Sequence, residues 1–303
     1  YPGNPKRIFV ALFGITGVLT TIWYTAFFSG LSFLRGPMRV DESVVEWMLL
    51  IAGTISMGFY IVVGKWSDKV GRKKPIIIGA IASLALLFPV FWGIGSLANP
   101  GLEESARAAP VTVNGPECEY DPFAEVQASP CGRALQDLTA LGVPYAIGDG
   151  IASGLTIGNR SYDYKDLPDE TRRAIIQSWL EVNGYDFTRQ TPPMQSIFGI
   201  IGLLLVLGVL SALTYGSVAA LLSEMFPARI RYSSMSIPYH IGAGYLGGFL
   251  PLIAGYIVAM TGDAYSGLWY TMAVVGFGLI VAWWGLPDGP PRDFEDSVQD
   301  PPV

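Results

Sequence analysis

A basic segment between Gly64 and Lys74 carries residues suited to reversible ion pairing. Gly64 and Gly71 permit tight backbone geometry. Asp68 can accept hydrogen bonds from a helix N-terminus or an arginine, and Arg72 offers a planar fork of donors. These groups suit a latch of ion pairs that breaks and re-forms. In a simpler reading, the lysines of the segment only set membrane topology.

His240 is the only histidine of the chain, and it lies within an apolar run. Histidine changes charge near neutral pH, and an ionisable group inside a membrane span indicates function. His240 is therefore a candidate for a proton pathway, with a structural hydrogen bond to a neighbouring helix as the alternative. From their positions, Trp23, Tyr24, Tyr215 and Tyr239 are candidates for a substrate pathway, with interfacial or packing roles as the alternative.

Six apolar runs position these residues. A helix that rises about 1.5 Å per residue needs roughly 20 apolar residues to cross a hydrocarbon core of about 30 Å. The runs carry almost no charge between their ends, as burial in lipid requires. They predict an all-α membrane protein with spans near residues 8–34, 44–64, 76–97, 196–222, 235–260 and 266–286.

Lysine and arginine in the short connections indicate the orientation of these spans. If the spans alternate, most of these cations share one side, which we expect to be cytoplasmic. The opposite side has Arg35 and Arg39 in its first short loop. The sequence thus predicts a multi-pass protein of the bacterial cytoplasmic (inner) membrane, with a disordered cytoplasmic tail at 287–303. The cations on the cytoplasmic side are Lys6, Arg7, Lys65, Lys69, Arg72, Lys73, Lys74, Arg229 and Arg231.

Residues 98–195 form a long polar segment, which we call the cap and expect outside the membrane. Its net charge of −7 exceeds the −6 of the whole chain. Cys118 and Cys131 both lie in it, and we expect them to form a disulfide, since an external compartment is oxidising. Two free thiols are the alternative. The pattern from Leu167 to Gly184 predicts a capped amphipathic helix.

Two motifs resemble those of the major facilitator superfamily. The spacing Gly-x-x-x-Asp-x-x-Gly-Arg-Lys, directly between two spans, is similar to the cytoplasmic loop signature of that superfamily. The spacing Glu-x-Phe-Pro-x-x-x-Arg is similar to an element of its sugar and metabolite-proton symporter branches, and Arg229 is an additional charge within it. The matching residues are Gly64, Asp68, Gly71, Arg72 and Lys73 for the first motif, and Glu224, Phe226, Pro227 and Arg231 for the second.

Further segments resemble the metabolite-proton symporter family, among them Trp23-Tyr24-Thr25, Pro238-Tyr239-His240-Ile241-Gly242 and Tyr265-Ser266-Gly267-Leu268-Trp269-Tyr270. The resemblance is greatest to this family, and it carries several implications. It implies the C-terminal six-helix half of a twelve-helix transporter, built from two inverted three-helix repeats at 1–97 and 196–286. By the same resemblance, Asp68, Arg72, Glu224 and Arg231 would form a cytoplasmic charge cluster that biases one conformation. We expect the N-terminal half to be missing from this chain, so that the fragment alone does not transport.

The function that this resemblance implies is proton symport of an organic acid or a zwitterionic osmolyte by alternating access. The proton would be the coupling ion, and no other cofactor is expected. A polytopic receptor whose external cap binds ligand is the alternative. A membrane enzyme is disfavoured because one histidine, two external cysteines and few carboxylates within the spans supply neither a metal site nor acid–base groups. The net charge of −6 suggests no nucleic-acid partner.

Overall fold

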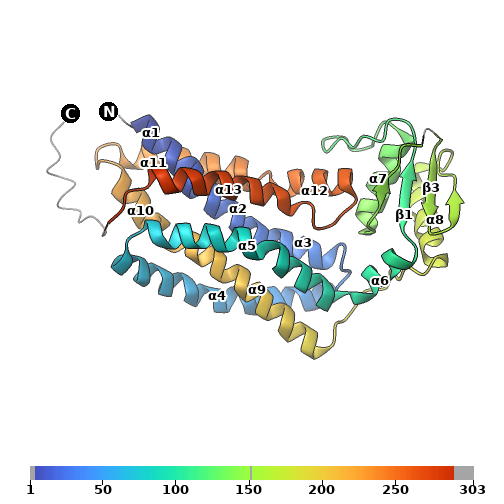
Figure 1. The fold of residues 1–303 in the computed structure, drawn as a ribbon, viewed down its shortest axis with the longest axis horizontal. Coiled ribbons are helices and arrows are strands. Elements are labelled where there is room, and N and C mark those ends of the chain that lie inside the picture. Colours follow the sequence, from blue (N-terminus) through green and yellow to red (C-terminus); the bar gives the residue numbers. More distant parts are fainter. Residues whose placement is uncertain (1–3, 151, 290–303) are drawn as a thin grey trace.

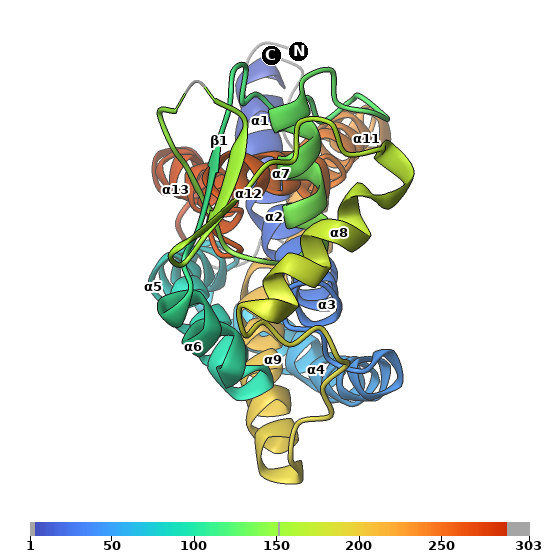
Figure 2. The same cartoon turned by 90° about the vertical axis from the view of Figure 1, so that its right-hand side faces the viewer.

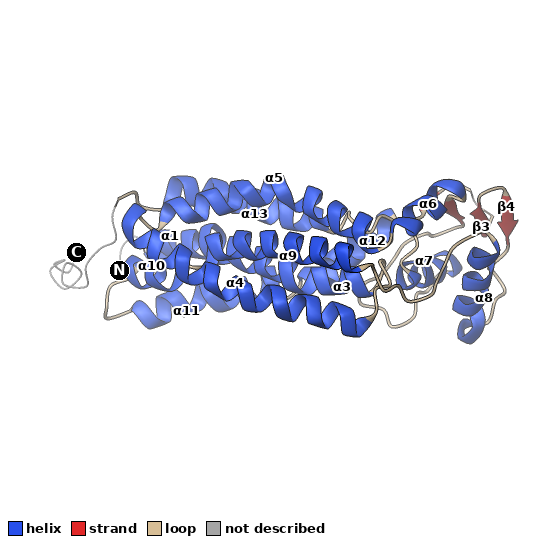
Figure 3. Ribbon diagram, turned by 90° about the horizontal axis from the view of Figure 1, so that it is seen from below, coloured by secondary structure: helices blue, strands red, loops and turns tan. Residues whose placement is uncertain are grey.

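The computed structural model describes residues 4–150 and 152–289 of the 303-residue chain. A long helical bundle carries a smaller cap at one end, and the first and last described residues lie at the other (Figure 1). All strands of the described residues lie in the cap (Figure 3).

Six helices within the described residues are long and apolar enough to cross a membrane. Their centres agree with the runs expected from the sequence, and most ends extend by a few residues into polar flanks. These helices are Asn4–Arg35, Glu42–Val70 (α4), Lys73–Ala98 (α5), Met194–Met225, Arg231–Thr261 and Leu268–Gly285 (α13).

Three of the six spans contain irregular turns. The first consists of α1 (Asn4–Phe9), η1 (Val10–Gly17), α2 (Val18–Tyr24), η2 (Thr25–Ser29) and α3 (Gly30–Arg35), in which η1 and η2 are π-helical. The fourth divides into α9 (Met194–Tyr215) and α10 (Val218–Met225). The fifth consists of α11 (Arg231–Ile241), the π-helical η3 (Gly242–Gly247) and α12 (Leu250–Thr261).

Small residues let the π-helical parts of the first and fifth spans approach closely. A Cβ on Gly242 would lie 2.6 Å from Cγ2 of Thr16, and a Cβ on Gly247 would lie 2.8 Å from Cδ2 of Tyr24. Such close packing is typical of helix pairs in membranes, where van der Waals contact replaces the hydrophobic driving force. π-Helical turns often occur at functional sites, and here two of them, η1 and η3, lie in contact.

The cap is not all-α, which corrects the expectation for this part of the chain. Its four strands form one sheet in the order β2-β1-β3-β4, with β2 parallel to β1 and the other pairs antiparallel. Each strand has only two to four residues, too few for a recognisable alternation of polar and apolar side chains. The strands are β1 (Val111–Asn114), β2 (Ala146–Ile147), β3 (Gly154–Ile157) and β4 (Arg160–Tyr162).

Three helices complete the cap: α6 (Pro100–Ala108), α7 (Pro130–Leu141) and α8 (Asp169–Val182). The last is the amphipathic helix that the sequence predicts. Asn99 and Ser129 accept backbone hydrogen bonds at the starts of α6 and α7, as N-cap residues do. The expected disulfide between Cys118 and Cys131 is present, with Cα atoms 4.9 Å apart.

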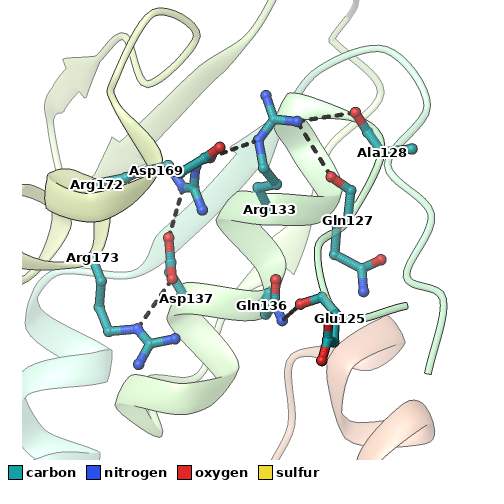
Figure 4. Close-up of polar contacts among 9 residues, drawn as sticks. All are labelled: Glu125, Gln127, Ala128, Arg133, Gln136, Asp137, Asp169, Arg172 and Arg173. Carbon is teal, nitrogen blue, oxygen red and sulfur yellow. Dashed lines mark hydrogen bonds and ion pairs between the residues drawn. The ribbon is translucent and has the colours of Figure 1, made fainter. Parts of the chain in front are cut away.

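A buried ion-pair network joins α7 to α8 (Figure 4). Arg172 Nε lies 2.7 Å from Asp137 Oδ2, and both side chains are less than a tenth exposed. Arg173 Nε lies 3.1 Å from the other oxygen of Asp137. Arg172 also pairs with the exposed Asp169, and this hydrogen bond lowers the pKa of the Asp169 carboxyl. Asp137 is therefore the shared carboxylate of the cap.

The cap is fixed to the bundle at two loops. Arg39, buried between α3 and α4, donates to the carbonyls of Asp186 at 2.7 Å and Leu141 at 2.8 Å. Its guanidinium lies 4.2 Å from the ring centroid of Phe187, and burial lowers its pKa. On the other side of the bundle, the Tyr145 hydroxyl donates to the Ala259 carbonyl of α12 at 2.5 Å.

One apolar core runs from the spans into the cap, which lies in front of the bundle in Figure 2. It joins Leu34 and Ile94 of the bundle to Val113 and Leu138 of the cap. A separate apolar cluster around Ile15, Leu222 and Phe226 lies at the opposite end. The two ends of the bundle therefore have different cores.

Candidate functional site

The loop after α4 and the end of α10 bring three of the expected charges together. Arg72 Nε lies 3.1 Å from Glu224 Oε1, and Arg72 Nη1 pairs with Asp68 on the preceding helix. Arg72 Nη1 also donates to Ser67 Oγ at 2.7 Å. The Arg72 and Glu224 side chains are 12% and 15% exposed, whereas Asp68 is 59% exposed. We call Asp68, Arg72 and Glu224 the charge cluster.

The two glycines of the basic segment fix the backbone around this cluster. Gly71 ends α4 with φ of 93°, a conformation that residues with a Cβ rarely adopt. This turn places Arg72 at the start of α5. A Cβ on Gly64 would lie 3.4 Å from the carbonyl oxygen of Gly216, so the second and fourth spans approach closely beside the cluster.

The remaining expected charges lie around the cluster in different ways. Lys73 Nζ pairs with Asp288 Oδ1 at 3.1 Å. Arg231 begins α11 and donates from Nε to the Phe226 carbonyl at 3.1 Å. Arg229 is exposed. The structure thus joins the two sequence motifs through the Arg72–Glu224 pair, which links residues 152 positions apart.

Tyr215 and Tyr239 also come together, which connects the fourth and fifth spans. Their hydroxyl oxygens lie 2.9 Å apart. Tyr60 of α4 lies beside them, with its ring centroid 6.0 Å from that of Tyr215 and its hydroxyl 2.7 Å from Ser211 Oγ. We call Tyr60, Ser211, Tyr215 and Tyr239 the hydroxyl cluster.

Sequence reasoning missed two members of the hydroxyl cluster, Tyr60 and Ser211. A polar atom within an apolar run needs a hydrogen-bond partner, and this was the available signal. The sequence could not pair the two residues, because they lie 151 positions apart on different helices.

The other pathway candidates lie elsewhere. His240 is exposed and touches the edge of the Tyr239 ring, with centroids 5.8 Å apart. Within the described residues, its side chain makes no hydrogen bond to a neighbouring helix. Trp23 and Tyr24 are half-buried in an aromatic cluster with Phe27 and Phe28, and the Tyr24 and Phe28 rings stack at 5.1 Å.

The chemistry available at these sites is binding and ion pairing. Among the described residues, no group of three or more His, Cys, Asp or Glu side chains is placed to hold a metal ion. The hydroxyl cluster offers donors and acceptors beside aromatic faces, which suits a polar or cationic organic solute. The charge cluster offers pairs that can differ between two helix arrangements.

Comparison with known proteins finds similarity to transporters. A citrate-proton symporter of Klebsiella pneumoniae is 30% identical over 81 residues, 26% of this chain and 18% of the relative. A glycine betaine/proline/ectoine/pipecolic acid transporter of Dickeya dadantii is 33% identical over 86 residues, 28% of this chain and 17% of the relative. A candidate proline/betaine transporter of Staphylococcus aureus is 30% identical over 87 residues.

These matches span about a fifth of the relatives' length, 19% for the Staphylococcus aureus protein, and 29% of this chain. No family model matches the chain. No solved structure matches it either. The similarity and the six apolar helices together place the chain with multi-pass membrane proteins that resemble transporters, and they point away from an enzyme.

Proposed function

We propose that this chain is the C-terminal six-helix half of a secondary active transporter for a small polar organic metabolite. The observation that carries the proposal is the Arg72–Glu224 pair, because it joins the two motifs by which the chain resembles the major facilitator superfamily. The similarity to betaine, proline and citrate transporters supports the same class.

The exposed spans suggest where the solute passes. The most apolar windows of α4 and of the fifth span are 22% and 17% buried, against 67% for the first span. Both spans carry members of the hydroxyl cluster, Tyr60 on α4 and Tyr239 on α11. We propose that a second six-helix unit covers this face, so that the solute binds between the two units.

The solute that fits this wall is an organic acid or a zwitterionic osmolyte. Tyrosine hydroxyls can donate to a carboxylate, and aromatic faces attract quaternary ammonium groups. We propose proton coupling from the family resemblance, with His240 beside the wall as one candidate on the proton's route. The basic end would face the cytoplasm across a bacterial inner membrane, with the C-terminus inside.

The charge cluster would bias alternating access. In rocking motions, helix ends that touch in one state separate in the other, and ion pairs across them favour the closed state. Arg72 and Glu224 belong to different three-helix groups of this chain. Their ion pair would therefore respond to motion between these two groups as well as to contact of the chain with a second unit.

Counterflow in liposomes tests the proposed function. The full-length protein should exchange radiolabelled betaine, proline or citrate across the membrane. Removing both hydroxyls in Tyr215→Phe/Tyr239→Phe should slow exchange at least tenfold, the equivalent of about 1.4 kcal/mol from lost hydrogen bonds. Tyr232→Phe is the matched control, because Tyr232 lies on the same span and is 80% exposed.

Exchange of none of these solutes would contradict the proposed substrate class. Binding of a solute by the cap without exchange would instead favour the receptor alternative. Equal exchange rates for the double variant and the control would show that the hydroxyl cluster does not lie on the solute path.

A further inference from the structure

A cavity of about 470 Å³ lies at the basic end of the bundle, between helices that are distant in sequence. Its walls come from α1, the start of α5, α10 and the end of α13. Figure 1 shows these elements together at the end of the bundle opposite the cap. The cavity lies next to the charge cluster, and Arg72 and Glu224 form part of its wall.

Two cations of this cavity have no carboxylate partner among the described residues. Its two acids are already paired, Glu224 with Arg72 and Asp288 with Lys73. Arg7 Nη1 donates to a neutral group, the Met225 carbonyl, at 3.1 Å. Lys6 is exposed and has no ion-pair or hydrogen-bond partner within residues 4–150 and 152–289. The cavity therefore has positive charge available for an anion.

Apolar side chains flank the same cavity. Trp284, which lines it, is 83% exposed at the end of α13, and Val10 and Leu221 also form part of the wall. Tryptophan is enriched where a membrane meets water, at the level of the lipid headgroups. Exposed aromatic surface beside Lys6 and Arg7 matches the two parts of a phospholipid, its acyl chains and its phosphate.

We propose that this cavity binds the phosphate of an anionic phospholipid, held by Lys6 and Arg7. A guanidinium binds phosphate oxygens through parallel hydrogen bonds, and an ammonium adds a point charge. Basic pockets between membrane helices bind anionic headgroups in this way. The bound headgroup joins α1 to the ends of α10 and α13 beside the Arg72–Glu224 pair. The inference rests on the proposed membrane placement but not on transport.

Native mass spectrometry of the purified full-length protein tests this site. Phosphatidylglycerol should bind with at least tenfold preference over phosphatidylcholine of the same acyl chains. The Lys6→Gln/Arg7→Gln variant should lose that preference about tenfold or more, given about fivefold per cation. Lys65→Gln/Lys69→Gln is the matched control, since both lysines are exposed at the same end but lie outside the cavity wall. The control should bind like the unchanged protein.

Three further results decide the proposal. Equal loss in both double variants would overturn it, because general surface charge would then explain binding. Displacement of the lipid by millimolar inorganic phosphate would assign the cavity to free phosphate instead. A chain ending at Gly289 should keep the preference, and loss of the preference on truncation would overturn the assignment, because Lys6 and Arg7 would then not suffice to hold the phosphate. Lipid binding does not require transport. The lipid site and the proposed transport function can therefore each fail without the other.

Discussion

The two ends of the helix bundle are held together by different forces. At the cap end, a continuous core and buried hydrogen bonds from Arg39 and Tyr145 join the spans to the cap, and a disulfide closes a loop within the cap. At the basic end, three charges meet beside an open cavity, over a small separate core.

This difference bears on where the bundle can move. Separating the cap end requires exposing a shared apolar core to water, at about 25 cal/mol for each Å² of apolar surface, and breaking buried hydrogen bonds that contribute about 0.5–1.5 kcal/mol each. Separating the basic end requires breaking the part-buried Arg72–Glu224 pair and the more exposed Arg72–Asp68 pair, and water in the adjoining cavity can solvate the separated charges. We therefore expect the cap to move with its spans as one body, and the basic end to be the part that opens.

The largest effect is expected from the cap network. Asp137→Ala leaves Arg172 buried without its carboxylate, and breaking a buried pair in this way costs about 3–5 kcal/mol. Thermal unfolding of the cap, followed by protease cleavage between α7 and α8, measures the loss. Glu170→Ala is the matched control on α8 because Glu170 is exposed. A loss below about 1 kcal/mol for Asp137→Ala would show that the network does not hold the cap.

The next effect comes from the disulfide. Replacing both Cys118 and Cys131 with serine opens a loop with a sequence separation of 13. The chain-entropy treatment puts the cost at about 3 kcal/mol. The same protease assay should show faster cleavage of the cap, while the thermal transition of the spans stays unchanged. A shift of both transitions would mean that the cap and the spans unfold together.

A smaller effect is expected at the basic end. Arg72→Gln should lower stability by about 1–2 kcal/mol, between the values for exposed and buried pairs. The charge exchange Arg72→Glu/Glu224→Arg should recover part of the loss in a double-mutant cycle, with the exposed Lys69→Gln as control. If Arg72→Gln costs as much as Asp137→Ala, the contrast between the two ends is wrong.

The smallest effect is a pH dependence in the cap. The hydrogen bond from Arg172 lowers the pKa of Asp169 in the folded state. A carboxyl with a lowered folded pKa adds stability above its unfolded pKa of about 3.9 and loses it as the pH falls further. The Asp169 contribution should be constant from pH 7 to 5 and decline below about 4. Asp169→Asn should remove this part of the decline, and an equal decline in that variant would assign it to other carboxyls.

The six spans were predictable because apolar length is a property of each segment by itself. The helix from Asp169 to Val182 was predictable for a similar reason, since its acidic first turn and apolar face are local signals. The Arg72–Glu224 pair was reached through two motifs, each read within a few residues of sequence. The contact between the two motifs, across 152 positions, was expected only from the resemblance.

The remaining features depend on distant partners. The four-stranded sheet pairs segments of two to four residues, and its order follows from contacts that no single strand encodes. Arg39 was predicted only as a loop cation, yet its buried guanidinium binds two ends of the cap. The Tyr60–Ser211 hydrogen bond and the π-helical turns likewise arise from packing between spans.

The most direct test of the account is the side of the membrane on which each end lies. Phe123 in the cap is 79% exposed, and Lys69 is exposed at the basic end. In intact cells, an impermeant thiol reagent should label Phe123→Cys, and it should label Lys69→Cys only after the membrane is opened. Labelling of both positions from the same side of an intact membrane would contradict the account.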